Sequence, residues 1–162
     1  MPITPNSSDE DNAAIAAAYL RFARVLRRGD DAELFSPNPD EAAYSGVDRA
    51  IREAPTDVVW RLILELLRQA PHDELVITAV GTLEPLLQRR GAEFVDRVEY
   101  EASADERFCW ALGQVWLRED DMPAEALDRI VRASGGQIKP MAKRQPLKGR
   151  LFRRLGELRK RD

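Results

Sequence analysis

The chain has 162 residues, 44% of them hydrophobic and 33% charged, and a formal net charge of −3. This length and composition predict a single globular domain that buries a stable core without disulfides or metal ions. They exclude a membrane-spanning helix, because the longest apolar stretches contain about a dozen residues, interrupted by Arg61, Glu65 and Arg68, whereas a span needs roughly 20.

Two further features predict a cytoplasmic protein. The N-terminal segment has no basic residue ahead of an apolar core, so it does not resemble a secretory signal. Cys109 is the only cysteine, and it lies in an apolar, aromatic run. An internal disulfide is therefore excluded, and a buried, inert thiol is expected.

The small net charge hides an asymmetry between the two ends of the chain. Residues 135–162 contain ten Lys or Arg and two acidic residues, a charge of +8, which leaves 15 basic and 26 acidic residues, a charge of −11, in residues 1–134. We predict an acidic helical domain at 1–134, followed by a basic linker and C-terminal amphipathic helix at 135–162. The two parts should attract each other, or different partners.

The first half of the chain predicts helices separated by proline-containing breaks. A capping box at residues 7–10 opens an amphipathic helix that ends near Gly29. Residues 30–46 are expected to form a loop because of Pro37 and Pro39, with at most one helical turn at 31–35, and a short helix should follow at 47–53. Adjacent apolar pairs repeating every four residues predict the central core helix over 58–67, which Pro71 stops.

The second half continues the helical pattern. Helices are expected at 73–80, at 82–90 with Thr82 as cap, and at 93–101. A capping box at residues 103–106 predicts a long helix to Leu117 that carries Trp116 on its buried face. We expect all three tryptophans to pack in the core, and Trp60 and Trp110, at the flanks of their apolar stripes, are the likelier exceptions. Asp121 is expected to cap a last helix that exits through residues 134–136.

No segment shows sustained alternation of apolar and polar residues, so no sheet is predicted. The fold class is all-α. The succession of helices resembles the helix pairs of HEAT-like α-solenoids, but no segment recurs at a fixed period, so an irregular multi-helix bundle is an equal alternative.

The residues that catalysis or metal binding usually requires are scarce. His72 and Cys109 are the only residues of their types, which excludes a zinc site, and neither a nucleophile elbow nor a phosphate-binding glycine loop is present. His72 is expected to be solvated or to cap a helix. We therefore predict no catalytic, cofactor-binding or metal-binding residue.

A row of carboxylates is the first candidate interaction surface. Glu93, Asp96 and Glu99 are spaced three apart, so they should lie along one side of a helix. A solvated helix face is the plainest interpretation, and a surface that meets a basic protein is the functional one.

The basic tail is the second candidate. Leucines at 147, 151, 155 and 158 predict a basic amphipathic helix. Its charged residues include Lys143, Arg144, Lys148, Arg150, Arg153, Arg154 and Arg159. Three uses compete: packing on the acidic body or on another subunit, which we favour, then binding of nucleic acid, then docking to an anionic membrane. Phe152 is the only aromatic residue in the tail that could stack on bases, which lowers the case for recognition of single strands.

Residues 81–117 resemble a family of uncharacterised bacterial domains. The matching residues are Gly81-Thr82-Leu83-Glu84-Pro85-Leu86-Leu87, Gly91, Glu93-Phe94-Val95-Asp96-Arg97-Val98-Glu99, Phe108, Leu112-Gly113 and Val115-Trp116. The resemblance implies a bacterial, helical, cytosolic protein and carries over no catalytic or binding residue. Within this motif, we expect Arg97 to bridge Glu84 or Glu93 and so join two helix termini.

These observations predict a non-enzymatic protein-interaction domain whose acidic body binds a basic partner. An immunity or antitoxin-like protein that occludes a cationic toxin is one concrete version. The alternative is a nucleic-acid-associated regulator that uses the basic tail, and an enzyme that relies on carboxylates and arginines alone has no specific support.

Overall fold

The computed structural model describes residues 8–29 and 37–142, and within them the fold is all-α, as predicted. The helices are α1 (Asp9–Arg28), α3 (Glu41–Glu53), α4 (Thr56–Gln69), α5 (Leu75–Gly81), α6 (Leu83–Arg90), α7 (Val95–Ala104), α8 (Glu106–Leu112) and α9 (Ala124–Ala133). Two short 3₁₀ turns, η1 (His72–Glu74) and η2 (Gly91–Glu93), join α4 to α5 and α6 to α7. The described residues form no strand beyond one isolated bridge between Arg118 and Met141.

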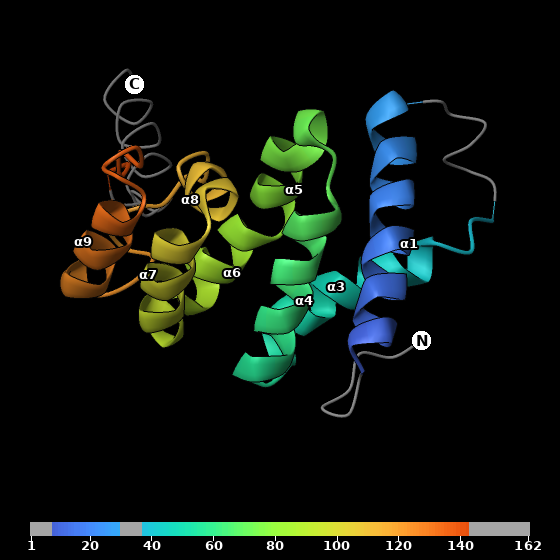
Figure 1. Ribbon diagram of the computed structural model, residues 1–162, viewed down its shortest axis with the longest axis horizontal. Coiled ribbons are helices and arrows are strands. Elements are labelled where there is room, and N and C mark those ends of the chain that lie inside the picture. The colour runs from blue at the N-terminus through green and yellow to red at the C-terminus, as the bar shows by residue number, and fades with distance from the viewer. Residues whose placement is uncertain (1–7, 30–36, 143–162) are drawn as a thin grey trace, which may run out of the picture.

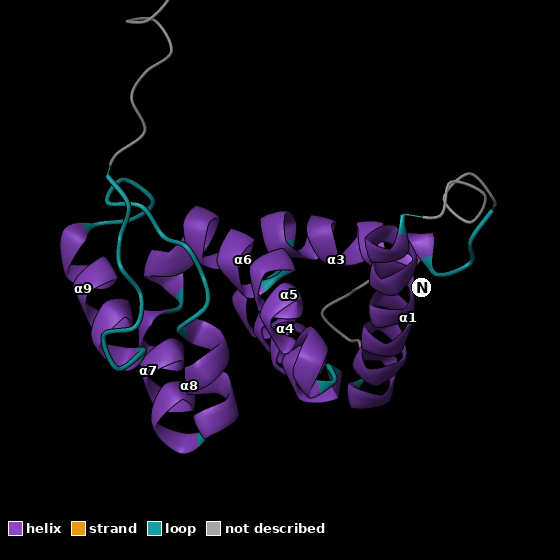
Figure 2. Cartoon of the chain, turned by 90° about the horizontal axis from the view of Figure 1, so that it is seen from above, coloured by secondary structure: helices purple, strands orange, loops and turns teal. Residues whose placement is uncertain are grey.

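The helices follow one another along the long axis of the molecule in nearly the order of the chain (Figure 1). α1 packs mainly on α3 and α4, α5 packs on α6, and α7 packs on α8 and α9. Seen from above, α3 and α6 run along one side, across the ends of the other helices (Figure 2). Most of the packing therefore joins helices that are adjacent in the chain or separated by one helix.

The predicted core helix is the centre of the packing. In α4, Leu62, Ile63 and Leu66 are fully buried, as the repeat of apolar pairs indicates. Trp60 is also buried, with ring centroids 5.4 Å from Phe94 and 5.8 Å from Phe108. The expectation that Trp60 packs in the core is therefore confirmed, and Phe94 at the start of α7 and Phe108 of α8 supply its aromatic partners at the flank of the α4 stripe.

The start of α1 lies one residue later than predicted. Ser8 is the N-cap, its hydroxyl accepts from the Asp11 N–H at 3.1 Å, and Asp11 accepts from the Ser8 N–H. An Asp completes this capping box, so the pair is Ser8 and Asp11. The predicted end is confirmed, because Gly29 adopts the left-handed conformation with φ of 65°.

The predicted loop extends too far into the chain. α3 begins at Glu41 and adds a turn and a half before the expected start, since the prolines at 37 and 39 precede the helix instead of interrupting it. The short turn expected at 31–35 lies outside the described residues.

The long helix predicted from Ser103 to Leu117 is instead a shorter helix followed by an extended segment. α7 continues to Ala104, and Asp105 caps α8 by accepting from the Arg107 N–H at 2.8 Å. α8 ends at Leu112, after which Val115 and Leu117 are buried while Trp116 between them is 68% exposed. This alternation is the period of an extended chain, so Trp116 is turned outward and the prediction that it packs in the core is wrong.

The last helix leads into a segment that returns to the body. Pro123 stands at the N-cap of α9 in place of the predicted Asp121, and the exit through Gly135 and Gly136, both with positive φ, is confirmed. Ile138 is buried, and the Met141 N–H donates to the Leu117 carbonyl at 2.9 Å. The first eight residues of the basic segment, 135–142, therefore pack on the helical body.

Candidate protein-binding surface

The backbone of Trp116 is hydrogen-bonded to the protein, whereas its side chain is exposed. Its N–H donates to Glu84 Oε2 at 2.8 Å, and its carbonyl accepts from Gln88 Nε2 at 2.8 Å. Glu84 and Gln88 lie one turn apart on α6, and they also bond each other at 3.2 Å. Both polar groups of the Trp116 backbone are thus satisfied by a helix that is distant in sequence.

Glu84 is a half-buried carboxylate with a perturbed titration. Burial raises its pKa above the ordinary value, and the charge of nearby Asp121 adds to the increase, while the bond from the Trp116 N–H acts in the opposite direction. The two carboxylate oxygens accept from one backbone and one side-chain donor, the Trp116 N–H and Gln88 Nε2.

The surface around the indole is acidic. Glu119 and Asp120 are exposed and lie three and four residues after Trp116, and Asp121 accepts from the Arg118 N–H at 2.7 Å. Gln88 and Arg89 form a polar pocket of about 300 Å³ with Asp120 and Asp121. An exposed aromatic side chain and exposed carboxylates therefore share one segment of the chain. We call this the Trp116 surface: Trp116, Glu119, Asp120 and the pocket residues Gln88, Arg89 and Asp121.

The predicted acidic row is divided between two arginines. Asp96 and Glu99 both pair with Arg129 of α9, Asp96 at 2.6 Å, and the bond from Arg129 lowers the pKa of Glu99. Glu93 belongs to η2 and pairs with Arg90 at 2.7 Å. The single row is thus split, although Asp96 remains 89% exposed in its side chain.

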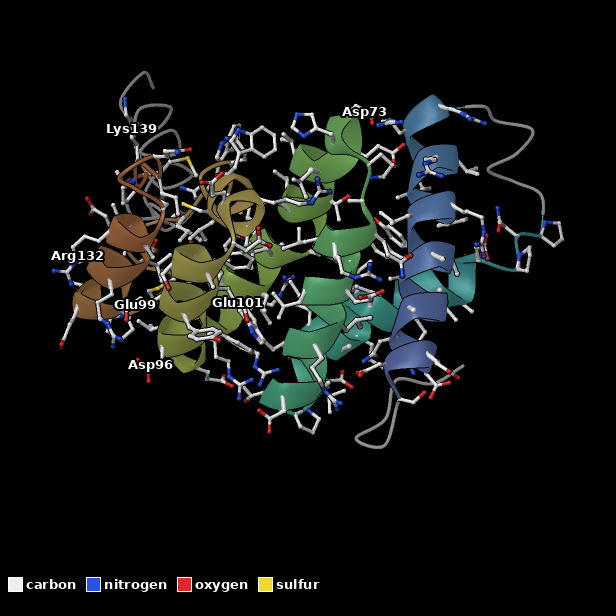
Figure 3. All side chains as sticks on the ribbon, viewed as in Figure 1. Asp73, Asp96, Glu99, Glu101, Arg132 and Lys139 are labelled. Carbon is white, nitrogen blue, oxygen red and sulfur yellow. The ribbon has the colours of Figure 1, made fainter. Side chains whose placement is uncertain are left out.

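The α7–α9 edge has a polar hollow beside this cluster. Glu93, Asp96 and Arg129 line a pocket of about 320 Å³ together with Glu125. Figure 3 shows Asp96 and Glu99 on α7, at the end of the molecule where α9 lies. Three carboxylates and one arginine line this pocket, so its lining is acidic.

Arg97 does not bridge the two glutamates. It pairs with Asp57, in the first turn of α4. The expected partners bind other residues, Glu84 the Trp116 N–H and Glu93 the Arg90 side chain. The predicted partners of Arg97 are therefore wrong, although Arg97 still joins two helices. Spacing within the motif gave no sign of Asp57, which precedes Arg97 by 40 residues.

Some of the remaining candidates lie outside the described residues. The tail residues from Lys143 to Arg159 lie outside the described residues. His72 is exposed, and its ring stacks on Trp110 with centroids 5.5 Å apart. Cys109 is half-buried instead of buried, and its thiol lies 3.6 Å from the Ala133 carbonyl oxygen.

Two negative findings concern the described residues alone. In residues 8–29 and 37–142, no three His, Cys, Asp or Glu side chains are arranged to hold a metal ion. Among the helices of these ranges, even the 20-residue α1 lacks the apolar composition that crossing a bilayer requires.

Comparison with known proteins shows the family of this chain. No curated protein and no solved structure matches it significantly. A family model matches residues 36–138, more than half of the chain, and this segment includes Glu84, Trp116 and every helix from α3 to α9. The chain therefore belongs to a family of unknown function, DUF6869.

Proposed function

We propose that this protein is a non-enzymatic interaction domain that binds a basic protein partner through the Trp116 surface. The observation that carries the proposal is the contrast at Trp116, whose backbone is bonded to α6 while its side chain is 68% exposed. Tryptophan is enriched among the residues that contribute most to protein interfaces, and a fixed backbone reduces the entropy lost on binding.

The chemistry of the surface indicates the charge of the partner. The face of an indole attracts guanidinium and ammonium groups, and Glu119 and Asp120 provide negative charge within a few residues. The excess of 26 acidic over 15 basic residues in 1–134 would speed the encounter with a cationic protein. An Arg or Lys of the partner, placed over the indole and beside a carboxylate, fits these features.

An immunity or antitoxin-like role is the concrete version that we favour. Such a protein has to occlude a cationic toxin and needs no catalytic group of its own. Its support is electrostatic complementarity, to which the acidic α7–α9 edge adds a second contact region with Asp96 and Glu99. The fold itself carries no information on this role.

The test is a pull-down from nuclease-treated lysate of the native host, followed by an affinity measurement on the protein it identifies. Trp116→Ala removes the exposed indole, and Val76→Ala is the control, because Val76 is 38% exposed on α5 and belongs to neither contact region. We expect Trp116→Ala to weaken binding by about 2 kcal/mol or more, as for an interface hot spot, and Val76→Ala to leave it unchanged. Equal binding by wild type and Trp116→Ala would refute the proposed surface.

The same experiment separates the nucleic-acid alternative. A chain truncated after Ala142 keeps the segment that packs on the body and removes the basic tail. The protein-binding proposal requires that truncation leave capture intact. Recovery that needs residues 143–162 and disappears with nuclease would instead make the chain a nucleic-acid-associated regulator.

A further inference from the structure

A pocket between α1 and α5 is separate from the Trp116 surface. It measures about 260 Å³, just below the about 300–1,000 Å³ of small-molecule sites. Its walls are largely apolar, with Leu20 and Ala23 from α1, Tyr44 from α3 and Ile77 from α5. Ile77 is 50% exposed, so part of this apolar surface is not buried in the core.

A tyrosine hydroxyl lies at the less exposed end of the pocket. Tyr19 is 5% exposed and lines the pocket, and its hydroxyl has no hydrogen-bond partner among the described residues. Burial raises the pKa of Tyr19 well above its ordinary value, so the hydroxyl keeps its proton and is available as a donor. Gly81 lies opposite, where a Cβ atom would come within 3.0 Å of the Tyr19 Oη.

Within its lining, the rim of the pocket has one more arginine than carboxylate. Arg24 and Arg27 both bind Glu74, so two guanidinium groups share one carboxylate in the lining. Arg24 uses its Nε on both oxygens of Glu74, at 2.7 and 2.9 Å, and it also lies in the field of Asp73. Within residues 8–29 and 37–142, Arg27 makes one contact, at 3.1 Å to Glu74, and its side chain is 43% exposed, so it presents further donors to a ligand.

The two polar ends are set apart by α1. Tyr19 and Arg27 are eight residues apart on this helix, which corresponds to about 12 Å along its axis. Ala23 lies between them, and its small side chain leaves the middle of the pocket open. The pocket is thus apolar along its length, cationic at the rim and hydrogen-bond donating at the inner end.

From this geometry we infer that the α1–α5 pocket binds a small organic carboxylate with an elongated apolar body. The carboxylate binds Arg27 at the rim, the apolar body lies against Ala23 and Ile77, and the Tyr19 hydroxyl donates to an oxygen at the far end of the ligand. A hydrocarbon chain alone leaves the hydroxyl unsatisfied, and a neutral ligand leaves the excess charge of the rim unused. The site therefore favours a chain with oxygen at both ends and a charge at one.

The test is calorimetric titration of the full chain with monomethyl decanedioate, which has a carboxylate at one end and an ester carbonyl at the other. Dimethyl decanedioate, without the charge, and decanoate, without the distal carbonyl, are the reference ligands. We expect monomethyl decanedioate to bind about tenfold more tightly than the neutral diester, the difference of one charged hydrogen bond. Absence of binding by the wild-type chain would overturn the inference.

Variants assign the binding to the pocket. Arg27→Gln should weaken monomethyl decanedioate about tenfold, whereas its neighbour Arg28→Gln, which does not line the pocket, should have no effect. Tyr19→Phe should remove the preference for monomethyl decanedioate over decanoate. Ala23→Leu should abolish binding by filling the pocket, and Ala14→Leu, on the exposed face of α1, controls for added bulk.

The two arginine variants have an outcome that contradicts the inference. Equal affinities of Arg27→Gln and Arg28→Gln would show that the charge acts at long range and not at the rim. Should Ala23→Leu fail to fold, the two arginine variants still decide the question, because both change exposed side chains. Loss of the Trp116 surface by mutation should leave this binding intact, which distinguishes the two sites.

Discussion

Replacing Glu74 with Gln should destabilise the fold measurably, because Glu74 joins α1 to the start of α5. The Glu74 side chain is 9% exposed and accepts from Arg24 and Arg27, which are 36% and 43% exposed. Breaking a fully buried ion pair costs about 3–5 kcal/mol, and an exposed pair contributes about 0–1 kcal/mol. This partly exposed cluster should contribute an energy between these two ranges, and Gln retains one acceptor oxygen. We therefore expect the free energy of unfolding to fall by about 2 kcal/mol.

The assay is thermal and urea unfolding of wild type and Glu74→Gln. A loss of about 2 kcal/mol corresponds to about 4–8 °C in Tm for a chain of this length. The bond from Arg24 holds the pKa of Glu74 below its ordinary value, so the stabilisation is present above that value and is lost as pH falls through the lowered pKa. The difference between the two proteins should be full at neutral pH and narrow below about pH 4.5.

The pH dependence is also what would refute this account of Glu74. A Gln variant as stable as wild type at neutral pH would show that the two arginines are solvated as well without the carboxylate. A difference that persists unchanged in acid would assign the effect to packing of the side chain and not to its charge. Arg68→Gln is the matched control, because Arg68 pairs with Glu65 on one helix and is 70% exposed.

Three other predictions test single features of the fold. Trp116→Phe should remove most of the tryptophan fluorescence that iodide quenches, since Trp60 is buried and Trp110 half-buried; unchanged quenching would contradict the exposure of Trp116. Arg107→Ala should cost about 1–3 kcal/mol in urea unfolding, because Arg107 donates to the carbonyls of Leu67 and Ala70 at the end of α4, and Arg107→Lys should recover part of this. Gly135→Ala should cost about 1–2 kcal/mol, because the residue has φ of 65°, and no change in Tm would show that the turn relaxes.

Apolar periodicity was sufficient to predict the all-α class and the central helix. In α4, adjacent apolar residues recur every four positions, and this spacing specifies which side chains are buried without reference to any partner. Proline and glycine marked most helix ends correctly, since Pro71 and Gly29 act through the backbone alone. Two adjacent serines could each cap α1, and the prediction chose Ser7 although Ser8 is the N-cap, so the predicted start was wrong by one residue.

The surface features depended on contacts that local patterns do not contain. The apolar residues 115–117 fit a helical stripe as well as an alternating chain, and the capping box at residues 103–106 favoured the wrong alternative. Asp105 outcompeted Ser103 because its side chain is in place to accept from the Arg107 N–H. The partners of Glu84 and Arg97 are 32 and 40 residues away in the chain, and such pairings follow from the packing of helices, not from spacing within one.

The exposure of Trp116 is specified by the structure around it and is not a default of a surface loop. A shift of one residue in this extended segment would bury the indole and expose Val115 and Leu117, both of which are almost fully buried. The bonds from the Trp116 N–H to Glu84 and from Gln88 to its carbonyl fix the same register from the other side. Apolar burial and hydrogen bonding thus agree on a register that leaves the largest side chain in water, at the expense of the free energy that burial of an indole would provide. A fold that maintains this arrangement with two independent restraints is consistent with a Trp116 that is buried in a complex.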